Sequence, residues 1–193
     1  MPTRMDSDTI EYARETRLSI DRIRINIFMC GAGVASKSKR KSSHHRRDLR
    51  LFMRDRLRSE ISRCDVKLGE HRRLIRAFRA AVGKSANLAD HEVNLAKRKK
   101  MDLIVVFPCS PGSFAELGMF SVADRIASKM VVFVDKAHRS SNSYLIEGPI
   151  KAAKLRTAKV QYVDYRNPAG IWSILREIVL EVKNRKRARR ALA

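Results

Sequence analysis

The chain has 193 residues, 44% of them hydrophobic, which is about the size of one domain with a buried core. No apolar run approaches the roughly 18 residues of a membrane span, and the N-terminus has no apolar signal segment, so we expect a cytoplasmic protein without membrane contact. Forty-two Lys and Arg residues against 20 Asp and Glu give a formal net charge of +22, which favours a polyanionic partner, above all nucleic acid.

Apolar, β-branched runs along the chain predict buried strands. Four clear runs and a weaker one are found at 23–30, 102–107, 130–135, 158–165 and, less strongly, 64–68. These runs are nearly continuous rather than strictly alternating, which is typical of a parallel sheet covered on both faces. A leading helix is expected within residues 1–20, where Ile10, Ala13 and Leu18 are apolar.

Helical spacing of apolar residues lies between the predicted strands, at 48–62, 113–128 and 167–184. Strands that alternate with helices predict an α/β fold, a Rossmann-like parallel sheet of about five strands flanked by helices. The chain then divides into three parts: an N-terminal helical lead (1–20), the α/β domain (21–183) and a basic C-terminal tail (184–193). The segment 37–45 is the best candidate for a mobile loop.

Four basic runs, at 37–47, 71–79, 96–100 and 183–190, account for much of the positive charge. Any one of them alone is equally consistent with a solvated face or a frayed tail. Together they favour contact with nucleic acid or a nucleotide-rich complex. Aromatic residues are only 6% and do not alternate with the basic runs, so contact with phosphates is favoured over base stacking.

Two glycine-containing loops follow predicted strands, "CGAG" (30–33) and "PCSPGS" (108–113). Ligands of parallel α/β sheets bind at the carboxyl ends of strands, and a helix start offers N–H groups to an anion. We therefore expect substrate contacts in both loops, although ordinary turn and cap roles explain the two serines equally well. The candidates are Cys30, Gly31, Gly33, Ser110, Gly112 and Ser113. No metal site is predicted, because "HEVN" (91–94) lacks a second histidine.

Glu116, in "FPCSPGSFAELGMFS" (107–121), has two interpretations. In one, "SFAE" is a capping box, with Ser113 as the helix cap and Glu116 reaching back to it. In the other, Glu116 lies in the first helical turn and the helix dipole keeps it ionised at neutral pH. An ionised carboxylate there suits a nucleophile or a stabiliser of an oxocarbenium-like sugar, and suits a general acid poorly.

Two blocks, "IFMCGAG" (27–33) and "NLAKRKKMDLIVVFPCSPGSFAELGMFSVADRIASKMVVFVD" (94–135), resemble the nucleoside 2-deoxyribosyltransferase family. That family has a Gly-x-x-x-Glu-[Leu/Ile]-Gly helix start whose glutamate is the nucleophile, and Glu116 occupies its place. "SPGSFAELG" (110–118) also resembles the deoxyribosyltransferase-like effectors encoded beside retron reverse transcriptases. Met29, Ser110 and Asn94 stand where the transferases carry a tyrosine and two aspartates, which favours a hydrolase acting on a different nucleotide. By this resemblance Asn94 joins the expected substrate contacts.

The resulting hypothesis is an N-glycosidase that acts on a nucleotide or on NAD, with Glu116 as catalytic carboxylate and no resident cofactor. The resemblance implies a toxin of a phage-defence system, held by a reverse transcriptase ribonucleoprotein, and a possible homo-oligomer. Two alternatives remain open, a non-catalytic nucleotide sensor and a basic nucleic-acid-binding module on the same fold.

Overall fold

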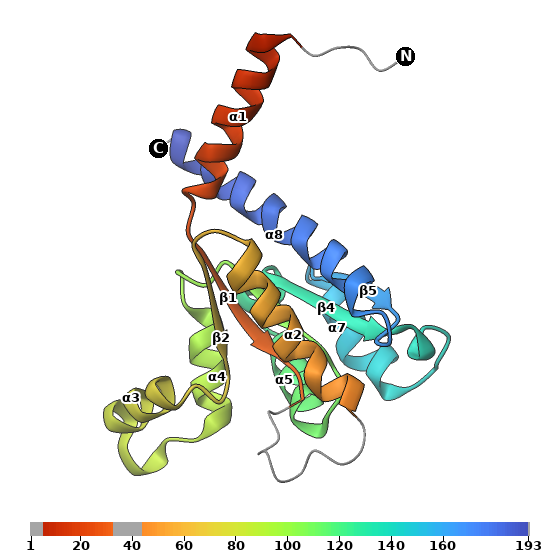
Figure 1. The fold of residues 1–193 in the computed structure, drawn as a ribbon. Coiled ribbons are helices and arrows are strands. Elements are labelled where there is room, and N and C mark those ends of the chain that lie inside the picture. The colour runs from red at the N-terminus through yellow and green to blue at the C-terminus, as the bar shows by residue number, and fades with distance from the viewer. Residues whose placement is uncertain (1–5, 33–43, 193) are drawn as a thin grey trace.

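The computed structural model describes residues 6–32 and 44–192, with the backbone alone at 44–48. Its centre is a five-stranded sheet in the order β2-β1-β3-β4-β5, in which every pairing is parallel (Figure 1). The strands are β1 (Ile25–Cys30), β2 (Cys64–Leu68), β3 (Leu103–Val106), β4 (Met130–Asp135) and β5 (Lys159–Val163). The predicted α/β fold with about five parallel strands flanked by helices is confirmed.

The three central strands, β1, β3 and β4, are buried on both faces, which explains why their apolar runs are continuous. In β1, Ile25, Ile27 and Met29 point into one apolar cluster, whereas Phe28 and Cys30 point into another on the opposite face. Side chains of a strand alternate between faces, so a strand in the middle layer of the fold needs an apolar residue at nearly every position.

Helices cover both faces of this sheet (Figure 1). The apolar cluster on one face is completed by α2 (His44–Glu60) and α8 (Pro168–Ala191), and the cluster on the other by α4 (Leu88–Lys97), α5 (Pro111–Ser121), α6 (Asp124–Ala127) and α7 (Lys151–Leu155). The remaining elements are α1 (Ser7–Asp21), α3 (Arg72–Val82), the short turns η2 (Gly83–Ser85) and η3 (Lys136–His138), and the π-helical turn η4 (Ile146–Ile150). Within the described residues, no helix is both long and apolar enough to cross a bilayer.

The predicted helices are present, with three differences. The segment predicted as one helix at 113–128 forms α5 and α6, which are separated by Val122 and Ala123. The boundary predicted at residue 184 falls inside α8, which continues to Ala191, so the basic residues there belong to a helix anchored in the core. Of the loop expected at 37–45, residues 37–43 lie outside the described residues, and residues 44–45 begin α2.

Helix α1 extends away from the sheet and runs beside the C-terminal part of α8 (Figure 1). None of its residues is buried. It is held where its last turn meets α8: the buried Lys183 lies 3.5 Å from the carbonyl oxygen of Asp21, and the Arg187 guanidinium donates to the Ser19 hydroxyl at 3.1 Å. The helix expected within residues 1–20 is present as α1, and its last turn rests on α8.

The strand order reverses between β1 and β3, because the chain builds the sheet outward from β1 in both directions. In doubly wound sheets, ligands bind outside the carboxyl ends of the strands at this point of reversal. The two strands are in close register there, and the Phe107 N–H donates to the Cys30 carbonyl at 3.1 Å. The loops that leave these two strands are the ones that carry the predicted site residues.

Candidate active site at the carboxyl edge of the sheet

Helix α5 begins at the end of β3 with a reciprocal cap formed by two serines. The Ser113 N–H donates to the Ser110 hydroxyl at 3.3 Å, and the Ser110 N–H donates to the Ser113 hydroxyl at 2.9 Å. Pro111 follows as the first helical residue, where its missing N–H costs nothing. The interpretation in which Ser113 caps the helix with Glu116 as partner is wrong: the capping box lies three residues earlier, and Glu116 is left to another role.

Glu116 lies in the second turn of α5 and points into the protein. The residue is only 8% exposed, and its Oε2 atom has no hydrogen-bond partner among the described residues. Its carboxyl group is within hydrogen-bonding reach of the Glu92 carboxyl on α4 and of the Cys30 thiol at the end of β1. A buried polar atom without a partner is costly in a folded protein, so this oxygen is a strong candidate for contact with a ligand.

Arg50 on α2 supplies the positive charge of this cluster. The residue is 2% exposed, and its guanidinium donates from Nη1 to Glu70 Oε2 at 3.1 Å and from Nη2 to Glu70 Oε1. This is a two-pronged arginine–carboxylate pair, a strong and oriented kind of ion pair. Glu70 follows β2, so the cluster joins side chains from β1, α2, the end of β2, α4 and α5.

Two glycines make room for these charged groups. A Cβ atom on Gly69 would lie 2.2 Å from Glu92 Oε1, and one on Gly31 would lie 3.1 Å from the Arg50 Cδ atom. The first distance is far inside van der Waals contact, so the Glu92 carboxyl takes this position only because residue 69 has no side chain. Gly31 was expected in the site, whereas Gly69, Glu70, Arg50 and Glu92 were not.

Burial dominates the electrostatics of the cluster. Burial, and then the neighbouring Glu92 carboxyl, raise the pKa of Glu116 to about 8 even though the Arg50 charge opposes this. Burial also raises the pKa of Glu92 and, together with Glu116, that of the Cys30 thiol. The expectation that the helix dipole keeps Glu116 ionised is wrong, because the dipole acts within the first turn and desolvation is larger here. At neutral pH the Glu92–Glu116 pair holds a proton.

The other predicted site residues are placed as follows. Cys30 is buried next to Glu116 and Gly31 is buried next to Arg50. Ser110 and Ser113 cap α5, and Gly112 is exposed in its first turn, where a Cβ would meet nothing within 4 Å. Gly33 lies outside the described residues. In the described part of the chain, no group of three or more His, Cys, Asp or Glu side chains is arranged to hold a metal ion.

Asn94 is not brought to Glu116. It is exposed on α4 and lines a separate cavity of about 340 Å³ between α3 and α4, together with Leu74, Phe78 and His91. Successive helical residues are about 100° apart, so two positions change the side of the helix. Glu92, two residues earlier, is therefore the α4 residue that faces α5. The neighbouring carboxylates of the sequence "ADHEVN" (89–94) were the available signal for it.

Comparison with known proteins gives two matches. Residues 46–191, most of the chain, match the family of the STM3845 retron effector protein. The chain is also 30% identical over 137 residues to "Retron Ec86 putative ribosyltransferase/DNA-binding protein" of Escherichia coli, a match that covers 71% of this chain and 40% of the relative. The matched part is thus well under half the length of that relative. Since the family match includes every described element from β2 to α8, the chain belongs to the STM3845 retron effector family.

Proposed function

We propose that this retron effector cleaves the bond between sugar and base in a nucleotide or in NAD, with Glu116 as the catalytic carboxylate. The observation that carries the proposal is the buried Glu116 carboxyl, with its unpartnered Oε2, behind the carboxyl ends of β1 and β3. The name of the Escherichia coli relative, which includes ribosyltransferase, supports glycosyl transfer as the class of reaction. The resemblance of residues 112–118 to the deoxyribosyltransferase helix start supports the same glutamate.

The proton held by the Glu92–Glu116 pair fits this chemistry. When that proton resides on Glu92, ionised Glu116 attacks the C1′ carbon of the sugar and forms an ester bond as the C1′–N bond breaks. A nucleobase takes the proton from the pair as it leaves. The nicotinamide of NAD is already cationic and leaves as the neutral base without that proton, and the additional proton formed in the hydrolysis step then passes to solvent. Water then hydrolyses the ester, which releases the sugar product and restores one proton to the pair. Two carboxyl groups in different protonation states divide acid and nucleophile roles in retaining glycoside hydrolysis in the same way.

The surrounding groups set the conditions for this step. Arg50 offsets the negative charge of the cluster, and burial strengthens each interaction inside it because the local dielectric is low. The Ser110 and Ser113 hydroxyls already bond to one another and to the backbone. We therefore assign contact with a sugar-phosphate to the exposed first turn of α5 at Gly112, where backbone N–H groups form the positive end of the helix dipole.

The test is chromatography of protein incubated separately with NAD, ribonucleotides and deoxynucleotides. Wild type is expected to release free base from one of the three classes, and Glu116→Gln is expected to lose at least about 10³-fold of the rate, as for removal of a catalytic nucleophile. Glu177→Gln is the matched control, because Glu177 is an exposed carboxylate on α8. Base release by Glu116→Gln at a rate near that of wild type, or none by wild type from any class, would contradict the proposal.

In this proposal the activity serves phage defence, and a reverse transcriptase with its nucleic-acid product holds the effector inactive until infection releases it. Membership of a retron effector family and the DNA-binding part of the relative's name support this setting. Adding the purified ribonucleoprotein to the base-release assay is expected to suppress the rate, whereas bovine serum albumin at the same concentration is not.

A further inference from the structure

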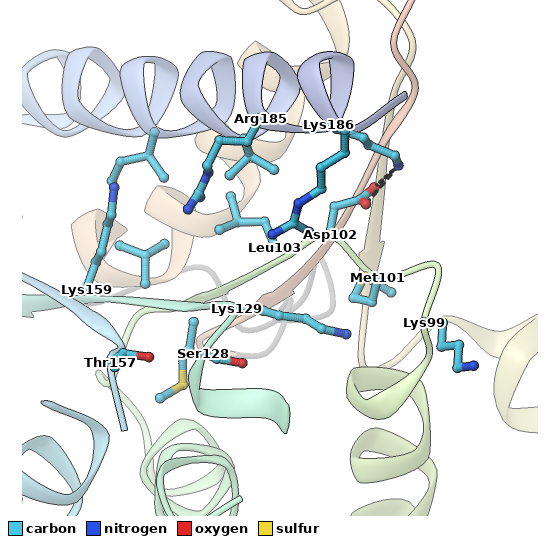
Figure 2. A pocket seen from close by; sticks show the side chains of 15 residues that line it. Lys99, Met101, Asp102, Leu103, Ser128, Lys129, Thr157, Lys159, Arg185 and Lys186 are labelled. Carbon is cyan, nitrogen blue, oxygen red and sulfur yellow. Dashed lines mark hydrogen bonds and ion pairs between the residues drawn. The ribbon is translucent and has the colours of Figure 1, made fainter. Parts of the chain in front are cut away.

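A second feature lies at the opposite edge of the sheet from Glu116. A cavity of about 520 Å³ is bounded by the amino ends of β3, β4 and β5 and by the last turns of α8 (Figure 2). Six cationic side chains from four separate segments line it: Lys99, Lys129, Lys159, Arg185, Lys186 and Arg189. Basic residues that are up to 90 positions apart in the sequence are thus gathered around one hollow.

Most of this positive charge is not neutralised from within. Among the described lining residues Asp102 is the one carboxylate, and it is already engaged: it accepts from Lys186 Nζ at 2.8 and 2.7 Å and from the Asn26 N–H at 2.9 Å. Lys159 and Arg185 both pair with Glu181, outside the lining. In the part of the chain that the structure describes, the remaining lysines and Arg189 have no ion pair.

Lys129 is a partly buried lysine of this cavity whose ammonium group has no ion pair with a described residue. Its Nζ donates to the Arg98 carbonyl at 3.2 Å, a neutral acceptor, and burial lowers the pKa of Lys129. The Asp102 carboxylate opposes this shift but is already paired with Lys186, so Lys129 is a partly desolvated ammonium group without an ion pair of its own, a poor arrangement for stability. An anionic group entering the cavity would compensate this lysine, and Lys99 and Arg189 line the same cavity.

The chemistry of the lining distinguishes between anions. The other lining side chains are aliphatic or carry a hydroxyl, and none of the described lining residues has an aromatic ring on which a base stacks. Cations continue past the rim, at the exposed Lys97, Arg98 and Lys100 before β3 and at Arg190 near the end of α8. A ligand with one phosphate would use the cavity alone, whereas a polymer with repeated phosphates matches both the cavity and its rim.

We propose that this cavity binds the phosphodiester backbone of a nucleic-acid strand, with Lys99, Lys129 and Arg189 as the principal phosphate contacts. The site is at the other edge of the sheet from the Glu92–Glu116 pair and shares no residue with it. Binding at this site should not depend on base sequence, because phosphate contacts position a strand without distinguishing its bases. The proposal does not depend on the glycosidase chemistry and is tested without it.

The experiment is fluorescence anisotropy of a labelled 20-nucleotide thymidine oligonucleotide, titrated with protein at several salt concentrations. The variant Lys99→Gln/Lys129→Gln/Arg189→Gln is compared with Arg72→Gln/Arg76→Gln/Arg79→Gln, which removes the same charge from exposed positions on α3. Loss of three phosphate contacts lowers the slope of log K against log salt by about 2, given ~0.7 per contact for a single strand. We expect at least about tenfold weaker binding at 0.1 M salt for the cavity variant and a near-wild-type slope for the α3 variant.

Three results would overturn the proposal. Equal losses in the two variants would mean that only the overall charge matters. Unchanged binding by the cavity variant, with its circular dichroism spectrum intact, would place the strand elsewhere. Displacement of the oligonucleotide by thymidine monophosphate at an equal concentration of phosphate groups would mean a mononucleotide site rather than a strand site.

Discussion

The two edges of this sheet have opposite electrostatic character. At the carboxyl edge, the buried Glu116 and the half-buried Glu92 carboxyl groups lie beside a single arginine, and at the amino edge six cations surround a single aspartate. In each case the lone opposite charge is already used, Arg50 by Glu70 and Asp102 by Lys186. The difference is exposure: burial at the first edge raises the pKa of Glu116, whereas Lys99, Arg185 and Arg189 at the second edge are exposed to solvent. The proposed chemistry at the carboxyl edge should therefore depend on pH, and the proposed binding at the amino edge should depend on salt concentration.

The largest expected effect separates the two edges by function. Glu116→Gln should lower base release by at least about 10³-fold and leave oligonucleotide binding unchanged, whereas the Lys99/Lys129/Arg189 variant should do the reverse and keep base release within about twofold of wild type. Both assays are run on the same protein preparations. A variant that fails in both, while still folded, would mean that the edges are coupled.

The next effect concerns stability and its pH dependence. The pKa of Glu116 is raised from 4.5 to about 8 in the folded protein, so the folded state keeps a proton that the unfolded state releases between these values. This contribution to stability is complete below pH 4.5 and is lost as the pH rises toward 8. Glutamine does not ionise, so Glu116→Gln avoids this fall in stability at high pH. We expect the free energy of unfolding of the variant to exceed that of wild type by roughly 1–3 kcal/mol at pH 8.

Urea unfolding at pH 5 and pH 8 measures this gain, which should be smaller at pH 5. Glu177→Gln again serves as the exposed control and should leave the free energy of unfolding within about 0.5 kcal/mol at both values. A Glu116→Gln protein that is less stable than wild type at pH 8 would show that the carboxyl has a structural role.

A smaller effect tests the packing behind the carboxyl pair. Gly69→Ala places a Cβ atom where the Glu92 carboxyl lies, so Glu92 must move, and we expect base release to fall about tenfold through misplacement of the pair. The control is a double-mutant cycle with Glu92→Ala, which removes the atom that clashes. If Gly69→Ala is as damaging in that background as in wild type, the glycine acts through the backbone and not through Glu92.

The smallest expected effect is an increase in oligonucleotide affinity at the amino edge. Asp102→Asn removes the one carboxylate of the cavity lining and frees Lys186, so oligonucleotide binding should tighten about two- to fivefold. Loss of this half-buried ion pair should lower the free energy of unfolding by about 1 kcal/mol. Asp124→Asn, at an exposed residue paired with Arg156 outside the cavity, is the control, and equal tightening in both variants would contradict the assignment.

Local signals in the sequence were sufficient for the sheet. The β-branched runs located β2 and β4 at their observed bounds and the other strands within two residues. The signal is clearest for the three central strands, because a strand covered on both faces has little freedom in composition. Helix α3 was read only as a basic run. Its apolar residues, among them Leu74 and Phe78, have helical spacing, but the arginines between them drew the interpretation toward charge.

Only part of the candidate active site could be predicted from the sequence. Glu116 and the loop residues around it were found from one contiguous motif. Arg50, Gly69 and Glu92 belong to three other elements, and only the sheet order brings them to the end of β1. The amino-edge cavity could not be read from the sequence for the same reason, because its cations come from segments that meet only in the fold.

Helix α8 joins two roles that usually belong to separate elements. Its first half is packed in the core through Trp172 and Leu175, and its last turns carry Arg185, Arg189 and further cations at the cavity. Like charges four residues apart repel one another along a helix, so these turns hold a repulsion that a bound polyanion or added salt relieves. In the proposed complex, nucleic acid would stabilise the fold as a ligand does: by mass action, binding of a strand would shift the equilibrium toward the folded protein.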